Sequence, residues 1–193
     1  MATLKLNSYE LFSQSSNNRP EFGAGGPTGC TLQVKSTTKT DQWGGSGVST
    51  GNNGVTPYAV TGLAVNITPK FSSSKILLFA DIFMGSADFQ NYNFLWSIHR
   101  SINSSVFNPI GVGNDPNAGA YVMGGHNFYP SAGNPFAGGT SKNYLDSPNT
   151  TLTITYQIYV GANDANATLY VNRRGVGAHI NGVSTITAME VAA

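Results

Sequence analysis

From Thr31 onward, apolar and polar residues alternate along most of the sequence. Leu63, Val65 and Ile67 follow this period of two, and so does the segment that contains Phe94 and Trp96. Successive side chains of a β-strand point to opposite faces, so the spacing predicts strands that turn one face toward a core. No segment carries the i, i+3, i+4, i+7 stripe of an amphipathic helix over a useful length. The pattern therefore restricts this chain to an all-β fold.

The strand-like segments are short and are joined by turns rich in Gly, Asn and Pro. About eight strands at such spacing predict an antiparallel β-sandwich of jelly-roll type for residues 30–193. Leu152 to Val160, a short Asn/Asp/Gly/Ala segment and a second run that begins with Leu169 are typical of a strand, a turn and a returning strand. Residues 127–142, rich in Gly, Pro and aromatic residues, are expected to form a loop. The strands are expected within residues 31–40, 56–69, 75–85, 93–101, 105–112, 119–125, 152–160, 169–174 and 183–191.

Residues 1–29 differ from the rest of the chain. Residues 13–29 carry too few apolar side chains to build structure of their own. The first residues keep a patterned start that can pair as a strand or lie along a neighbour. We therefore expect an N-terminal arm that anchors the domain through Leu4, Leu6, Tyr9 and Leu11.

The charge content limits the classes of partner. Charged residues make up 10% of the chain and the net charge is +1, whereas soluble domains carry roughly 25%. Lys and Arg are scattered, so the basic stripe of a nucleic-acid-binding protein is missing. No stretch approaches the ~20 apolar residues of a membrane span, and the N-terminus does not resemble a signal peptide. A surface this low in charge is typical of proteins that pack against neighbours in a particle.

The residues that usually carry chemistry do not form a recognisable site. His99, His126 and His179 lie far apart and lack the spacing of zinc ligands. The turns around Asp115 and Asp164 lack the spaced carboxylates of a calcium loop. Cys30 has no basic neighbours, which favours a structural thiol. We expect His99 and Arg100 to face a carboxylate such as Asp81 in a structural pair. The sequence predicts no enzyme, no metal and no cofactor.

Two of the expected strands are apolar on both faces. In residues 75–85, Ile76, Leu78, Ala80 and Ile82 can face the core while other apolar residues point the opposite way. A sheet with one wet face should instead alternate apolar with polar residues. A symmetry mate, or the chain's own arm and loops, could cover the second face. The residues expected at such an interface are Leu77, Phe79, Phe83, Met189 and Val191.

Aromatic residues also occur in segments that are expected to be loops. Such rings can anchor a subunit interface, and we favour this interpretation for the loop aromatics Trp43, Phe89, Tyr92, Phe128, Tyr129, Phe136 and Tyr144. Flat rings beside Asn, Gly and Ser can alternatively stack on sugars, as in an adhesin. The residues that would face a glycan in this alternative are Trp43, Tyr92, Phe128, Tyr129 and Phe136.

Several strand sequences resemble a module of tailed-phage virion proteins. They are LQVKSTTKTD, VTGLAVNITPKFSSSKILLFADI, LDSPNTTLTITYQIYV, LYVNRR and STITAMEVAA, and the opening MATLKLNSYE is similar more loosely. In marine and cyanobacterial phages this module often ends tail-fibre-like proteins. The resemblance implies a homotrimeric β-sandwich on the outside of a virus particle. Because the N-terminus does not resemble a signal peptide, we expect the chain to be made in the host cytoplasm.

The expected function is therefore non-enzymatic and structural. We expect a homotrimer fixed through its arm to major capsid or tail proteins, as a capsid decoration or cement protein. The alternative is a tail-fibre head or receptor-binding adhesin that recognises a host-surface glycan. Fibre-like relatives carry shaft segments ahead of the module, and residues 1–29 contain none, which favours the decoration protein.

Overall fold

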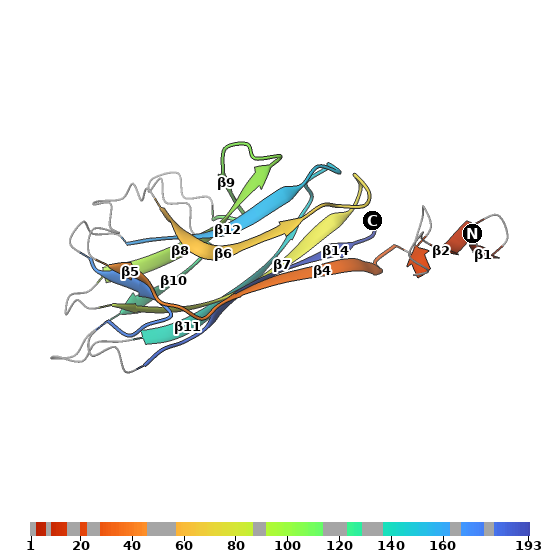
Figure 1. The fold of residues 1–193 in the computed structure, drawn as a ribbon. Helices are drawn as coiled ribbons and strands as arrows, with labels where there is room; N and C mark the ends of the chain where they lie inside the picture. Colours follow the sequence, from red (N-terminus) through yellow and green to blue (C-terminus); the bar gives the residue numbers. More distant parts are fainter. Residues whose placement is uncertain are drawn as a thin grey trace.

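The computed structural model describes residues 3–6, 9–14, 20–22, 28–45, 57–86, 92–113, 123–128, 137–162, 167–175 and 180–193. These residues form strands, turns and irregular segments without a helix, so the described part of the chain holds no helix suited to crossing a membrane. Two antiparallel sheets pack face to face (Figure 1). The predicted all-β sandwich is confirmed.

The first layer is a six-stranded sheet centred on β7 (Lys75–Ser86). One edge of β7 pairs with β11 (Ala137–Asp146) along its whole length. The other edge pairs first with β14 (Ser184–Val191) and then with β13 (Leu169–Val171). Beyond these lie β4 (Thr31–Lys39) and β5 (Trp43–Gly45), which pair with β14 and β13 respectively. Two strands placed end to end therefore continue the sheet on this side of β7.

The second layer is a five-stranded sheet. Its strand order is β10 (Gly124–Phe128), β8 (Tyr92–Ile102), β12 (Ile154–Ala162) and β6 (Tyr58–Ile67). The short β9 (Asn108–Ile110) pairs with β8. All of these pairings are antiparallel.

The pairing between the eight main strands is nested, as a jelly roll requires. The first of them pairs with the last, β4 with β14, and the second pairs with the second-to-last, β6 with β12. Further inward β7 pairs with β11, and β8 pairs with β10. Successive pairs alternate between the two sheets. The chain therefore folds as a long double ribbon wrapped into a sandwich.

The core lies between the two sheets and follows the predicted alternation. On β7 the fully or nearly fully buried side chains are Ile76, Leu78, Ala80, Ile82 and Met84, and on β8 they are Phe94, Trp96 and Ile98. Burial of each large apolar side chain stabilises the fold by about 1.5–3 kcal/mol. Tyr156 faces this core while Tyr159 lies on the opposite face of β12, as the spacing predicts.

Asn172 holds together the junction between the end-to-end strands. Its side chain is fully buried and its φ of 62° is in the left-handed region, which Asn tolerates. Its Nδ2 donates to the carbonyl oxygens of Lys39 (2.7 Å) and Asp41 (3.1 Å), and its Oδ1 accepts from the hydroxyl of Ser184 (2.6 Å). One side chain thus satisfies the polar groups left where β4 and β14 give way to β5 and β13.

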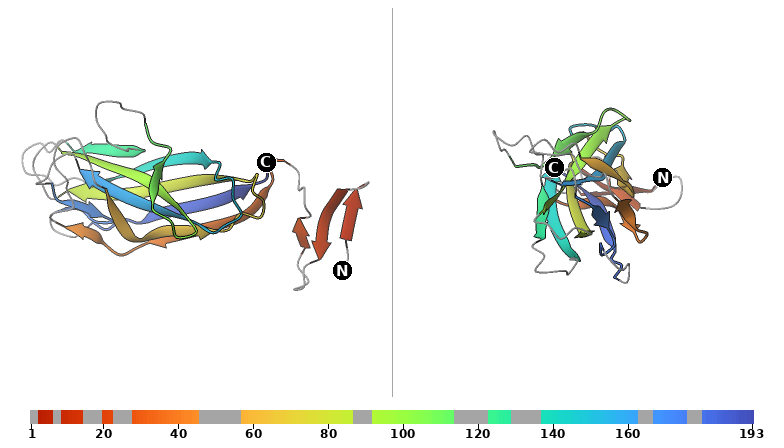
Figure 2. Two further views of the ribbon diagram at one scale, coloured as in Figure 1. Left: turned by 90° about the horizontal axis from the view of Figure 1, so that it is seen from above. Right: turned by 90° about the vertical axis from the view of Figure 1, so that its left-hand side faces the viewer.

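The chain enters and leaves the sandwich at the same end. The amide of Gly29 donates to the carbonyl of Ala192 (2.7 Å), and the amide of Ala192 donates to the carbonyl of Cys30 (2.9 Å). In Figures 1 and 2, the C-terminus lies at this end of the sandwich, beside the start of β4. β5 lies toward the opposite end of the sandwich (Figure 1).

The predicted hairpin at residues 152–174 is wrong. β12 and β13 are both strands, but β12 belongs to the five-stranded sheet and β13 to the six-stranded sheet. Alternation predicts each strand correctly but does not specify its partner. In a jelly roll the connection at this point crosses from one sheet to the other.

The predicted loop at residues 127–142 is also wrong in part. β10 extends to Phe128, and β11 already begins at Ala137. β11 pairs only with β7 and forms a sheet edge, where few of its side chains are buried. Its sequence AGGTSKNYLD therefore lacks the apolar alternation by which the other strands were recognised. Trp43, Tyr92, Phe128 and Tyr144, which were expected in loops, all lie in strands.

The N-terminal segment has more structure than its composition predicts. β1 (Thr3–Leu6), β2 (Tyr9–Gln14) and β3 (Pro20–Phe22) form a small antiparallel sheet. The register places Leu4, Phe12 and Phe22 opposite one another across the three strands. Figure 2 shows this sheet standing apart from the sandwich. The expectation that residues 13–29 form no structure of their own is therefore wrong for Pro20–Phe22.

A buried polar cluster ties the two sheets together. Asp146, at the end of β11, accepts two hydrogen bonds from Nη1 of Arg100 on β8 (2.8 and 2.9 Å). Its Oδ2 also accepts from the hydroxyl of Tyr156 on β12 (2.7 Å). Burial, and next the Asp146 carboxylate, raise the pKa of Tyr156, so this phenol stays protonated and donates. A charged pair and a phenol thereby connect the layers inside the protein.

Replacement of Asp146 by Ala should lower the free energy of unfolding by about 3 kcal/mol or more, because Arg100 and Tyr156 both lose their partner. Tyr156→Phe removes one hydrogen bond to a charged group and should cost about 1–3 kcal/mol. Urea unfolding followed by fluorescence measures both variants. Lys70→Ala, at an exposed side chain, serves as control and should change stability by less than about 0.5 kcal/mol. An Asp146→Ala variant as stable as this control would contradict a stabilising role for the cluster.

Candidate interaction surface

The six-stranded sheet exposes a broad apolar region on the side that faces away from the core, which we call the outer face. Strand register places Val34, Met189, Leu77 and Leu145 next to one another across β4, β14, β7 and β11. We call these four residues the apolar row. The exposed fraction is 50% for Val34 and 47% for Leu145, while Leu77 and Met189 are half-buried. Four adjacent strands thus each present an apolar side chain at the same level of the sheet.

Further apolar residues extend the row. Phe79, two residues beyond Leu77 on β7, is 42% exposed, which is high for a phenylalanine on a central strand. Val191 lies two residues beyond Met189 on β14 and is half-buried. A shallow groove of about 240 Å³ runs beside Phe79, lined also by Asn143, Thr187 and neighbouring residues of the three strands. Because of this groove the outer face is not flat, and a complementary surface can insert side chains into it.

The polar groups of the outer face largely bond with one another. The hydroxyls of Ser36 and Thr187 lie 2.8 Å apart across β4 and β14. The hydroxyl of Ser141 donates to Asp81 (3.3 Å) across β11 and β7. Such cross-strand pairs lower the cost of removing a face from water, because each hydroxyl keeps a partner. The outer face therefore combines exposed apolar area with polar groups that tolerate burial.

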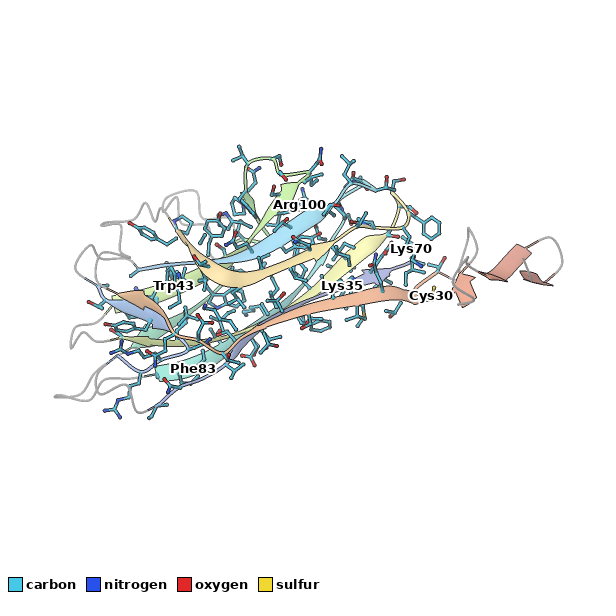
Figure 3. All side chains as sticks on the ribbon, in the orientation of Figure 1. Cys30, Lys35, Trp43, Lys70, Phe83 and Arg100 are labelled. Atoms are coloured by element: carbon cyan, nitrogen blue, oxygen red, sulfur yellow. The ribbon has the colours of Figure 1, made fainter. Side chains whose placement is uncertain are left out.

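The structure brings together four of the five predicted interface residues. Leu77, Phe79, Met189 and Val191 are contiguous on the outer face. Phe83 lies farther along β7, near the end of the sandwich opposite Cys30 (Figure 3). The backbone of Gly182 packs directly on its ring, where an added Cβ would overlap the ring carbons. The chain itself therefore covers part of Phe83.

Two residues of the apolar row were missed from the sequence. Val34 lies on a segment recognised as a strand, but its neighbours are polar and no second apolar face was evident. Leu145 lies on β11, at the end of a segment that was expected to be largely loop. Only the register of four strands reveals that both residues adjoin Leu77 and Met189.

The outward side of the five-stranded sheet differs, because side chains of the same chain cover it. Ser97, His99 and Ser101 point away from the core and are nevertheless 1%, 6% and 2% exposed. The imidazole of His99 stacks on Tyr159 with 3.9 Å between the ring centroids. Phe107 lies 5.9 Å from the Tyr159 ring. This side therefore offers less free surface around His99 than the outer face does around the apolar row.

His99 does not have the carboxylate partner that was expected. Its Nε2 lies 3.0 Å from the hydroxyl of Ser97. Asp81 belongs to the other sheet, and the partner of Arg100 is Asp146. Burial lowers the pKa of His99 from 6.5 to about 4, since no negative charge offsets the loss of water. His99 is thus a buried neutral imidazole at neutral pH.

The remaining candidates fall into three groups. Trp43 packs partly against the core and borders a cavity at the end of the sandwich. Tyr92 and Phe128 pair across β8 and β10, and their side chains lie outside the described residues. Tyr129, Phe136 and Phe89 also lie outside them, as do the Asp115 and Asp164 turns, the His126 side chain and His179. Within the described ranges, no three His, Cys, Asp or Glu side chains gather as metal ligands would, and Cys30 is a half-buried free thiol.

The solved structures that resemble this chain include a distantly similar viral chain. No protein-family model matches the sequence, and no curated protein matches it. A chain in a structure of infectious bursal disease virus, Gx strain, aligns over 100% of this chain and 47% of its own length. The identity is 11% and the TM-score 0.41. The chain thus spans about half of that viral chain, and a likeness at this level supports no argument about function.

The buried imidazole makes stability depend on pH. Because the folded pKa of His99 is about 4 and its ordinary value is 6.5, the unfolded chain binds the proton first as the pH falls. The contribution of His99 is complete above pH 6.5 and is lost between pH 6.5 and 4, on the order of 3 kcal/mol. We expect urea unfolding to show a smaller loss for His99→Gln over this range. The difference between wild type and variant isolates His99 from titrating carboxylates, and identical pH profiles would contradict its burial in the neutral form.

Proposed function

We propose that this protein is a non-enzymatic structural component of a tailed-phage virion, a homotrimer on the particle exterior that is attached through its N-terminal segment. The observation that carries the proposal is the uncovered outer face of the six-stranded sheet. Its apolar row and Phe79 form a continuous region across four strands. A decoration or cement protein of the capsid fits this surface best, since its role is to pack against copies of itself and against the particle.

The composition of the outer face supports self-association. On the four long strands, Lys75 and Asp81 are the charged residues at outward register positions within the described residues. Interface cores are depleted in charged residues and enriched in aromatic residues and Met. Phe79 and Met189 are of this kind. Closed symmetry is the usual way for copies of one chain to bury the same patch, and the phage resemblance favours a trimer.

The N-terminal sheet supports attachment. Only 13 of its residues lie in strands, and a sheet this small requires packing against another surface to be stable. It is joined to the sandwich at the end where the chain enters and leaves. A separate small module at one end of a rigid domain is well placed to bind a capsid or tail protein while the sandwich extends outward.

A second candidate, a receptor-binding fibre head, is favoured by one observation. A cavity of about 490 Å³ is bordered by Trp43 on β5 and Tyr170 on β13, and β5 lies toward the end of the sandwich away from the N-terminal sheet (Figure 1). Aromatic rings beside a polar cavity can hold a sugar. The two candidates differ in where the protein sits on the particle. Immunogold labelling of intact particles distinguishes them, because a decoration protein labels the head and a fibre head labels the tail.

Phe79→Asp should convert a trimer into a folded monomer. The wild type should give a light-scattering mass three times that of the 20.3 kDa chain. An aspartate at this position is tolerated by the single chain, where Phe79 is 42% exposed, but would place an unpaired charge in the interface. Val106→Asp is the matched control, because Val106 is 78% exposed on a loop and its replacement should leave the trimer intact. A monomeric wild type, or a trimeric Phe79→Asp variant, would refute the proposed interface.

Deletion of residues 1–22 removes the N-terminal sheet and should leave the trimer folded, with a nearly unchanged melting temperature. Among the residues whose burial is described, the sandwich core is built from β6 to β14, and the N-terminal sheet stands apart from the sandwich in Figure 2. Attachment to particles should nevertheless be lost. The measurement is co-sedimentation of purified variant with particles that lack the protein, with full-length protein as control. Full binding by the truncated protein would show that attachment runs through the sandwich, and failure to fold would show that the segment belongs to the core.

A further inference from the structure

The cavity at the far end of the sandwich is an open depression lined by polar and aromatic residues. It is lined by Gln42, Trp43, Gly44, Tyr170 and Arg173. Figure 3 shows Trp43 near the end of the molecule opposite Cys30, where the N-terminal segment joins. If the N-terminal sheet binds the particle, this cavity faces the surrounding medium. Its volume of about 490 Å³ lies within the ~300–1,000 Å³ range of small-molecule sites.

Gly44 leaves the floor of the cavity without a side chain. It lies opposite Tyr170 in the pairing of β5 with β13, and its φ of 119° is in a region that favours glycine. A Cβ at this position would overlap the carbonyl oxygen of Leu169 and come within 3.0 Å of the Tyr170 Cα. The close strand pairing therefore requires glycine. Gly44 therefore contributes only backbone atoms to the lining of the cavity.

Arg173 supplies a positioned positive charge. Its guanidinium carbon lies 4.3 Å from the centroid of the Tyr170 ring. Its Nε donates to the carbonyl of Arg174 (3.2 Å), and its Nη2 lies 3.5 Å from the carbonyl of Gly175. These contacts hold the guanidinium in place, which reduces the entropy lost on binding a ligand. Its Nη1 has no hydrogen-bond partner among the described residues.

Gln42 supplies complementary polarity on the same cavity. Its Nε2 donates to Oδ1 of Asn181 (2.6 Å), which fixes the amide. Its Oε1 accepts no hydrogen bond from the described part of the chain and is available to a ligand hydroxyl. The five lining residues include no carboxylate. Among the described residues, the cavity thus combines the guanidinium of Arg173, the amide of Gln42 and aromatic surface, and none of its five lining residues is negatively charged.

We propose that this cavity binds an acidic saccharide, with the sugar carboxylate on Arg173 and ring hydroxyls on Gln42. Guanidinium groups bind carboxylates with directional, charge-assisted hydrogen bonds. Trp43 and Tyr170 border the same cavity, and their flat rings can pack against a sugar ring. A phosphate ligand is usually bound by several cations or by converging backbone amide groups, whereas the described lining of this cavity contains one guanidinium. The proposal deepens the receptor-binding candidate by naming its ligand class, and it does not depend on the oligomeric state.

The test is isothermal titration calorimetry of the full-length protein with three probes, each an oligomer of three units. Tri-galacturonic acid should bind saturably, and its affinity should fall as salt is raised. Maltotriose, a neutral saccharide of the same length, should bind at least about tenfold more weakly, because it lacks the partner of Arg173. Tri-glutamate carries carboxylates without sugar rings and should also bind at least tenfold more weakly. Equal affinity for tri-glutamate would refute a saccharide site, and equal affinity for maltotriose would refute recognition through the charge.

Variants locate the site. Arg173→Gln and Gln42→Ala should each weaken binding of tri-galacturonic acid, Arg173→Gln by at least about tenfold. Lys35→Gln removes a positive charge from an exposed position on β4 and should leave the affinity unchanged. All variants should keep the wild-type melting temperature. If Arg173→Gln is unstable while Gln42→Ala keeps the wild-type melting temperature, the affinity of Gln42→Ala for tri-galacturonic acid is the deciding measurement. Unchanged binding by Gln42→Ala, or no binding by wild type at millimolar probe, overturns the proposal, while particle attachment and trimer formation remain independent measures of the proposed function.

Discussion

Packing two sheets face to face buries only the facing side of each sheet, and this constraint governs the functional interpretation of the protein. β7 is apolar on both faces, and the core uses only the face with Ile76, Leu78 and Ile82. Nothing in the described part of the chain covers Leu77 and Phe79 completely. Exposed apolar area is costly in water, and the second apolar face of this central strand supports the partner that we propose. Because β4, β14 and β11 align their own apolar side chains beside Leu77, the proposed contact surface would span the sheet.

The two ends of the sandwich have different physical characters. At one end, backbone hydrogen bonds between residues 29–30 and Ala192 close the first and last strands together. At the other, β13 and β5 take over from β14 and β4, and Asn172 satisfies the carbonyl groups that this change leaves unpaired. The same change of strands brings Gly44 opposite Tyr170 and creates the cavity. The irregularity of the sheet and the candidate ligand site thus have one structural origin.

Alternation predicted most of the sandwich because a period of two reports which face of a strand meets the core. It placed Leu63, Val65 and Ile67 inside correctly, and also Phe94, Trp96 and Ile98. Alternation could not predict which strands pair, because the sequence of Leu169–Val171 has the same pattern whether the strand pairs with β12 in a hairpin or with β7. An edge strand such as β11 buries few of its side chains, so its sequence does not show the alternation of apolar and polar residues. The interaction surface was found in part, through the doubly apolar β7 and β14, whereas Val34, Leu145 and the Gly44–Tyr170 cavity depend on register between distant segments.

The shared end of the first and last strands has a consequence for engineering. A peptide fused after Ala193 would emerge beside the junction with the N-terminal sheet, since Ala192 is hydrogen-bonded to Gly29 and Cys30. On a decorated particle such a cargo would be held close to the shell, in competition with the attachment site. Cargo inserted between β5 and β6, or between β7 and β8, would start about 36 Å farther away, the length of the 12-residue strand β7 at roughly 3.3 Å per residue. As a display scaffold, this jelly roll should therefore carry its cargo in those connections and keep its C-terminus free.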